Sequence, residues 1–217
     1  MKDMKTLLEL SARRHRDHLC PRQVLGVRMG MYAAELLDID LPQSDKRVFA
    51  FVETDGCVVD GITAATGCAP GSRTLRIIDY GKTAATFVDT TTHRALRILP
   101  SPESRKRAYD YAQDAPDRWH AQLLGYQVMP GDELLVAQSV TLSVSMAAII
   151  SRHGLRAICD ICGEDIINER EVHRADRVLC RSCAGDAYYT LGSDAVPQTQ
   201  LPAAAGVRIF ANEFARA

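Results

Sequence analysis

The sequence predicts an α+β protein, in which a domain of helices and mostly antiparallel strands precedes a small four-cysteine zinc ribbon. Strand-like runs are grouped between residues 47 and 99, whereas the longer helical patterns lie apart from them. This grouping argues against repeated βαβ units and for an α+β arrangement. Two CxxC pairs, Cys159/Cys162 and Cys180/Cys183, follow near the C-terminal end and are typical of a zinc-stabilised module.

The composition along the chain predicts three parts. The 217 residues are enough for one sizeable core and an attached small module. We expect the α+β domain over residues 1–150 and the zinc ribbon over 151–189. A polar, proline-containing linker and a tail are expected over 190–217.

Two helices are expected before the first strand. Residues 4–15 have apolar positions at helical spacing. Pro21 suits the first turn of a second helix that runs to about Leu37. An apolar stripe along this second helix is formed by Leu25, Met29, Ala33 and Leu36.

The central part of the chain alternates between strand and helix signals. Valine and phenylalanine content predicts a strand over Arg47–Glu53. A helix over Val58–Thr66 is expected to end at Gly67, since glycine is a favoured residue after a helix. The remaining expected elements are strands at Thr74–Asp79, Ala84–Asp89 and Ala95–Leu99, a helical segment over Pro102–Leu124 interrupted near Pro116, and a strand over Asp132–Val144.

The four C-terminal cysteines carry the strongest chemical signal. Seventeen residues separate the Cys159/Cys162 pair from the Cys180/Cys183 pair. Zinc prefers four soft ligands in a tetrahedron, and each CxxC turn offers two thiolates to one side of the ion. The spacing therefore predicts structural zinc bound by all four cysteines, with no open coordination position for a substrate.

Charge and hydropathy exclude several classes of function. The formal net charge is −1, and residues 152–189 contain six basic and seven acidic side chains, so nucleic acid is not an expected partner. No apolar run approaches the roughly 20 residues of a membrane span, and the N-terminus lacks the apolar run of a signal peptide. We expect a cytoplasmic protein, in which cysteines favour metal or thiol chemistry over disulfides.

The other three cysteines stand at junctions between predicted elements. Cys20 precedes the Pro21 helix, Cys57 begins the next helix, and Cys68 follows Gly67. Together with His18, these cysteines have the ligand types that zinc or a similar metal accepts. Their spacing leaves a second metal site and simple burial of small thiols equally open.

Acidic residues near Cys57 allow an enzymatic hypothesis. Cys20 would be the nucleophile or a metal ligand, and Asp55 or Asp60 would be the base. Each acid also has an ordinary interpretation, because aspartate is common in turns and at helix caps. Whether the protein is an enzyme is left open.

Four runs in order resemble one known family. They are RDHLCPRQVLGVRMG, ETDGCVVDGITAATGC, DYGKTAATF and the ribbon from Cys162 to Tyr189. They are similar to the signature of the FmdE family, named for a component of formylmethanofuran dehydrogenase, and cover most of residues 10–189. The departures are Arg16 and Asp17 in place of the histidine and glycine of the family's HGH run, and Thr83 where a histidine often follows DYGK.

The resemblance implies an α+β domain joined to a ribbon, and a homodimer. It also implies that His18, Cys20, Cys57 and Cys68 gather in one pocket. The leading hypothesis is a zinc-binding protein that uses this pocket as a metal-binding or accessory component of a molybdenum- or tungsten-dependent enzyme system.

Two alternatives belong to other classes. One is a metal- or cysteine-dependent hydrolase or transferase that uses the same pocket. The other is a regulator acting through a protein partner, since the ribbon also looks like that of the DksA/TraR proteins.

Overall fold

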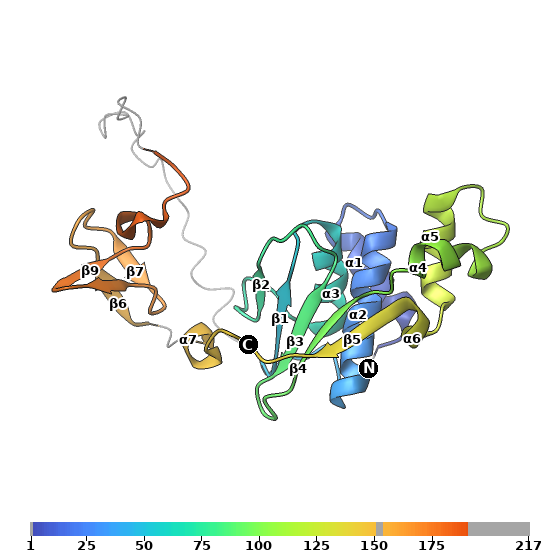
Figure 1. Cartoon of the computed structure of the whole chain (residues 1–217), viewed down its shortest axis with the longest axis horizontal. Helices are drawn as coiled ribbons and strands as arrows, with labels where there is room; N and C mark the ends of the chain where they lie inside the picture. The colour runs from blue at the N-terminus through green and yellow to red at the C-terminus, as the bar shows by residue number, and fades with distance from the viewer. Residues whose placement is uncertain (1, 151–153, 191–217) are drawn as a thin grey trace, which may run out of the picture. The chain divides into compact units, whose positions relative to one another are not determined.

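The computed structural model describes residues 2–150 and 154–190 of the chain (Figure 1). The chain divides into two compact units, Met1–Ile150 and Ser151–Ala217. The predicted tail, from residue 191 onward, lies outside the described residues. Within the described ranges, no helix is long and apolar enough to cross a membrane.

A five-stranded sheet forms the centre of the first unit. Its strands are β1 (Val48–Val52), β2 (Leu75–Ile77), β3 (Ala85–Asp89), β4 (Ala95–Pro100) and β5 (Leu135–Ser139), in the order β2-β1-β3-β4-β5. Only β1 and β2 pair in parallel, and every other pair in this sheet is antiparallel. The mixed helical and antiparallel arrangement confirms the predicted α+β class.

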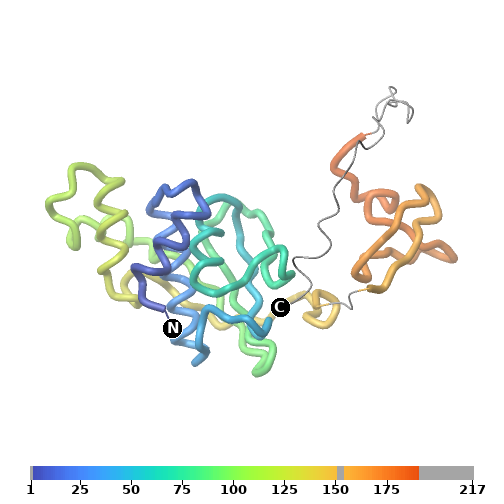
Figure 2. Tube along the Cα trace, turned by 180° about the vertical axis from the view of Figure 1, so that it is seen from behind, coloured from blue at the N-terminus to red at the C-terminus, as the bar shows by residue number. Residues whose placement is uncertain are grey.

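Three helices cover one face of this sheet. They are α1 (Met4–Arg14), α2 (Pro21–Leu37) and α3 (Cys57–Thr66), whose apolar side chains share one core with alternate residues of the strands. Figure 2 views this helical side of the unit. In β1, Val48, Ala50 and Val52 join that core. Phe49 and Phe51 belong to a second cluster on the opposite face, as the alternation of side chains along a strand requires.

The second half of the unit contains shorter elements. These are α4 (Ser104–Arg107), the 3₁₀ turn η1 (Ala108–Tyr111), α5 (Arg118–Val128), α6 (Gly131–Leu134) and α7 (Met146–Ile150). The predicted strand over Asp132–Val144 is wrong at both ends, because α6 takes its first residues and β5 ends at Ser139. Asp132 and Glu133 lie in the first turn of α6, where negative charge is favoured.

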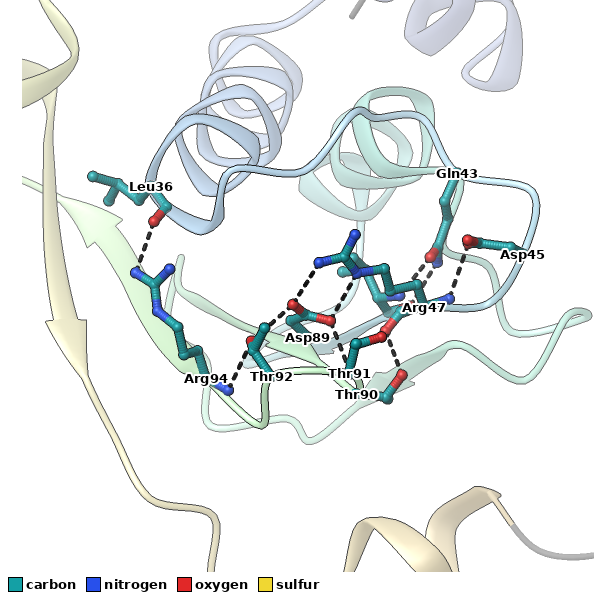
Figure 3. A network of polar contacts seen from close by, with 10 residues as sticks. Leu36, Gln43, Asp45, Arg47, Asp89, Thr90, Thr91, Thr92 and Arg94 are labelled. Atoms are coloured by element: carbon teal, nitrogen blue, oxygen red, sulfur yellow. Dashed lines mark hydrogen bonds and ion pairs between the residues drawn. The ribbon is translucent and has the colours of Figure 1, made fainter.

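The buried carboxylate of Asp89 accepts hydrogen bonds that stabilise the turn between β3 and β4 (Figure 3). Asp89 is fully buried and accepts hydrogen bonds from Arg47 Nε and Nη2 at 3.0 and 2.9 Å. It also accepts from the Thr91 amide at 2.9 Å and the Thr92 hydroxyl at 2.8 Å. The Arg47 guanidinium and these donors hold the pKa of the Asp89 carboxyl well below its usual range.

Replacing this carboxylate should weaken the fold in a pH-dependent way. We expect Asp89→Asn to lower the free energy of unfolding at pH 7 by about 2–4 kcal/mol, because a buried ion pair loses one partner. Since the native pKa is depressed, the stabilisation is present above the unfolded pKa of about 3.9 and is lost as the pH falls below it. Urea unfolding of both proteins between pH 7 and pH 3 measures this difference, which should shrink with acidification.

The matched control is Asp45→Asn. Asp45 is exposed and accepts a single hydrogen bond, from the Arg47 amide at 3.1 Å. We expect its replacement to change stability by less than about 0.5 kcal/mol. Equal losses in the two variants would contradict a special role for the buried carboxylate.

The second unit consists of two short hairpins and a helical turn. The hairpins are β6 (Arg156–Ile158) with β7 (Asp165–Ile167), and β8 (Val172–Arg174) with β9 (Arg177–Leu179), followed by η2 (Ser182–Asp186). Asp160 joins the hairpins, since its backbone amide bonds to the Val178 carbonyl and its carboxylate accepts from the Val178 amide. The arrangement matches the predicted four-cysteine ribbon.

Candidate functional site

Four cysteines gather in the second unit as their spacing predicts. Cys159 directly follows β6 and Cys180 directly follows β9, so each hairpin delivers one CxxC turn to the same place. The sulfurs of Cys159, Cys162, Cys180 and Cys183 all lie within 4.8 Å of one another. In the ranges that the structure describes, this is the one group of three or more such ligand atoms.

Backbone amides donate hydrogen bonds to two of these sulfurs, which favours the thiolate form. The Cys180 amide donates to Cys159 Sγ at 3.3 Å, and the Cys183 amide donates to Cys180 Sγ at 3.4 Å. Amides of Cys162 and Cys180 lower the pKa of Cys159 to about 6. The pKa of Cys183, in contrast, is raised to about 12, chiefly by the hydrogen bond with the Cys180 side chain. Because like charges this close disfavour one another, all four cysteines can be ionised together only with a cation among them.

The cluster fits a tetrahedral metal ion. Metal–sulfur bonds of about 2.3 Å in a tetrahedron separate the sulfurs by about 3.8 Å. Cys162 Sγ and Cys180 Sγ are 3.9 Å apart. Four protein ligands complete the coordination, so such a metal would hold the two hairpins together and leave no position for substrate.

In the first unit, two cysteines that are distant in sequence come together. Cys20 Sγ lies 3.0 Å from Cys57 Sγ. Cys20 precedes the first residue of α2, and Cys57 is the first residue of α3. The buried Gln23 fixes Cys20, because its Oε1 accepts from the Cys20 amide at 2.8 Å while its Nε2 donates to Ser11 of α1.

Two glycines allow this close approach of the cysteines. A Cβ on Gly26 of α2 would lie 2.3 Å from the Val58 carbonyl oxygen, and one on Gly61 of α3 would lie 2.3 Å from the Gln23 carbonyl oxygen. Both obstacles are backbone atoms, so the helices could not remain at this distance with larger residues. The glycine contact therefore sets the separation of the two helix N-termini that carry the sulfurs.

The Cys57 thiol is hard to ionise in this setting. Burial is the main cause that raises its pKa to about 12, and the hydrogen bond with Cys20 adds to it. The positive charge of Arg22 acts in the opposite direction. The pair therefore holds at least one proton at neutral pH, which a metal would have to displace.

The two sulfurs open into a cavity of about 720 Å³, which we call the thiol cavity. Its wall is formed by residues of α2, α3, β4, α4 and α5 and by residues 81–84 of the loop between β2 and β3, with Trp119 and Tyr126 among them. The volume is in the range of small-molecule sites. The Cys20 and Cys57 sulfurs thus face a space that is large enough for a small organic molecule as well as for a metal ion.

The other two predicted ligands have contacts of their own. Cys68 is fully buried in the core of the first unit, where its thiol contacts the Val48 carbonyl at 3.3 Å and Gln43 Nε2 at 3.4 Å. The His18 ring stacks on Trp119 with centroids 6.2 Å apart. Cys68 and His18 are not among the described residues that line the thiol cavity.

The candidate acids and the family departures have different surroundings. Asp60 Oδ2 is 3.2 Å from His15 Nδ1, and Asp55 is exposed. Thr83 lines the thiol cavity. Arg16 has a φ of 55°, in the left-handed region that favours glycine.

Sequence reasoning missed several residues of the cavity wall. Arg22, Arg97, Arg105 and Trp119 line it from α2, β4, α4 and α5. A charged residue that directly follows a cysteine-proline helix start, as Arg22 does, was a usable signal. The contributions of β4, α4 and α5 depend on tertiary packing and left no comparable pattern.

Residues 15–135 match the family described as FmdE, molybdenum formylmethanofuran dehydrogenase operon. A curated relative from Archaeoglobus fulgidus, a probable S-adenosyl-L-methionine-binding protein, is 27% identical over 212 residues; the match covers 86% of this chain and 55% of the relative. The chain therefore spans about half the length of that relative.

A solved structure has the same fold. It is a tungsten formylmethanofuran dehydrogenase FmdE-like protein from Syntrophus aciditrophicus, with a TM-score of 0.50 and 20% identity. The match covers 83% of this chain and 91% of that one.

Proposed function

Because this chain belongs to the FmdE family, we propose that it is a metal-binding accessory protein of a molybdenum- or tungsten-dependent enzyme system. In this proposal zinc occupies the four-cysteine cluster as a structural ion, and a second metal binds at the thiol cavity. The homodimer implied by the family resemblance stays a prediction.

The Cys20–Cys57 pair carries the proposal for the second metal. The two sulfurs lie 3.0 Å apart at the wall of a cavity, and paired thiolates are preferred ligands of soft and borderline metals. To bind one tetrahedral ion they would move apart to about 3.8 Å. They would supply two of the four ligands that zinc-like ions accept. The open positions distinguish this site from the closed ribbon cluster and suit exchange of a metal or a ligand.

Metal content tests the proposal directly. We expect two metal ions per chain in the wild type and one in Cys57→Ser, because the serine hydroxyl is a poor ligand for a soft metal. Elemental analysis of protein dialysed against metal-free buffer gives both numbers. One metal per chain in both proteins would overturn the second site.

The matched control is Cys68→Ala. Cys68 lies in the core and outside the thiol cavity, so this variant should keep two metals even if its stability falls. Loss of the second metal in Cys68→Ala would instead support the four-ligand set predicted from the sequence.

The size of the thiol cavity favours a second function, binding of a small organic ligand. The curated relative is named for S-adenosyl-L-methionine, and about 720 Å³ is ample for a molecule of that class. The single tryptophan of the chain, Trp119, lines the cavity. Its fluorescence during titration with S-adenosyl-L-methionine therefore separates the two functions.

A further inference from the structure

The thiol cavity contains positive charges that a metal bound to cysteines would not use. Arg22, Lys82 and Arg105 line it, and none of them forms an ion pair with another described residue. Arg97 also lines the cavity but is neutralised by Glu53, which accepts from its Nε and Nη2 at 2.6 and 2.8 Å. These three cations of the cavity wall are exposed to solvent, and none of them has a counter-charge among the described residues.

The surroundings strengthen the positive potential of these cations. None of the described residues that line the thiol cavity is acidic. Cys20 and Cys57, at the N-terminal ends of α2 and α3, also line it, and the positive end of a helix dipole favours anions. A concave wall with charges of one sign concentrates this potential on whatever enters.

A buried hydroxyl gives an independent indication of a ligand. Ser104 is 1% exposed and lines the cavity, and among the described residues its Oγ is the one buried side-chain polar atom without a hydrogen-bond partner. It interacts with the Tyr126 phenol, and this interaction opposes part of the burial-driven rise in the pKa of that phenol. Buried hydroxyls are normally fully bonded, so the Ser104 hydroxyl keeps the capacity for a hydrogen bond to a ligand in the cavity.

We propose that the thiol cavity binds an oxyanion, held by Arg22, Lys82 and Arg105 and by a hydrogen bond from the Ser104 hydroxyl. The inference rests on the proposed function, because it assigns the class of ligand to the same cavity. A phosphate ester and an inorganic oxyanion share this chemistry, and titration with two probes distinguishes them.

The fluorescence of Trp119 reports binding of inorganic phosphate or molybdate at constant ionic strength. We expect saturation by at least one probe in the wild type. The double variant Lys82→Gln/Arg105→Gln should bind it at least about tenfold more weakly, since it removes two charged contacts with the anion. The matched control, Lys106→Gln/Arg118→Gln, has the same net charge but alters exposed cations outside the cavity wall, and should bind like the wild type.

A second variant separates ligand binding from folding. Ser104→Ala should weaken binding about fivefold or more, since it removes a donor to a charged ligand. The same change should leave the urea midpoint unchanged or raised, because it removes a buried hydroxyl whose hydrogen bonding is incomplete. A structural role for Ser104 would lower the midpoint instead.

The outcomes are distinct from those of the metal test. Tighter binding of phosphate indicates a phosphorylated molecule, and tighter binding of molybdate indicates an inorganic oxyanion. No saturation by either probe, or equal weakening in both double variants, overturns the oxyanion site while the metal count is unaffected. Conversely, if the chain holds only one metal ion but still binds a probe saturably, the oxyanion site is supported and the second metal site is overturned.

Discussion

Cys162→Ser should unfold the second unit while the first unit stays intact. The core of this unit, as far as it is described, has four buried residues: Cys159, Ile166, Leu179 and Ala184. Its strands are three residues long. So small a core does not offset the conformational entropy of the chain without a metal. Metal binding in such modules supplies about 10–16 kcal/mol, which is also the free energy of folding.

Cys162 is the informative ligand to replace because it is exposed. Its loss removes one bond to the metal without creating a cavity in the core. Hydrogen exchange measured by mass spectrometry on the full chain should show loss of amide protection over residues 154–190 and none over 2–150. Treatment of the wild type with a strong chelator should give the same pattern, and added zinc should reverse it.

The neighbouring Ile161→Ser is the matched control. Ile161 is 55% exposed and lies in the same turn, so its replacement should leave protection unchanged. Retained protection in metal-free Cys162→Ser would contradict a metal-dependent fold for this unit.

Gly61→Ala should destabilise the first unit by about 3 kcal/mol or more. The added methyl group would lie 2.3 Å from the Gln23 carbonyl oxygen and 2.8 Å from the Val27 amide nitrogen. Both are backbone atoms of α2, so the helices must separate, and overpacking of this kind costs about 1–3 kcal/mol, occasionally more. Urea unfolding measures the loss.

The same substitution should also affect the thiol cavity. Because α2 and α3 begin at Cys20 and Cys57, separating the helices separates the sulfurs. We expect Gly61→Ala to lose the second metal under conditions in which the protein is still folded. Elemental analysis together with circular dichroism at the same temperature tests this.

Gly71→Ala provides the control for a general effect of replacing glycine. No atom lies within 4 Å of a Cβ built on Gly71, and its φ is outside the left-handed region. Its replacement should change stability by less than about 1 kcal/mol and keep the metal content. If Gly61→Ala behaved in the same way, the glycine contact would not control the separation of the cysteines.

Local signals explain why much of the fold was predictable. Pro21 begins α2, and Gly67 ends α3 with a φ of 74°. These residues act through their own backbone preferences, so neighbouring sequence is sufficient to place the helix ends. The ribbon was predictable for a related reason, since a CxxC turn brings two sulfurs together within four residues.

Local signals were insufficient where several interpretations fitted the same residues. Over Asp132–Val144, apolar residues suited a strand, whereas the structure has the helix α6 followed by a shorter β5. Leu134 is fully buried within α6. Burial of that side chain against the rest of the unit is a tertiary contribution that a strand pattern does not contain.

By itself, the sequence determined the α+β class, the family resemblance and the four-cysteine cluster, because each rests on short-range spacing or on motifs in order. Only the tertiary structure decided which of the remaining cysteines meet. Cys20 and Cys57 are 37 residues apart in the chain and come together because α2 and α3 pack at glycines. Cys68 is closer to Cys57 in sequence, yet the turn after Gly67 directs it into the core. Convergence over such distances depends on how whole helices pack, and no local preference of the residues specifies it.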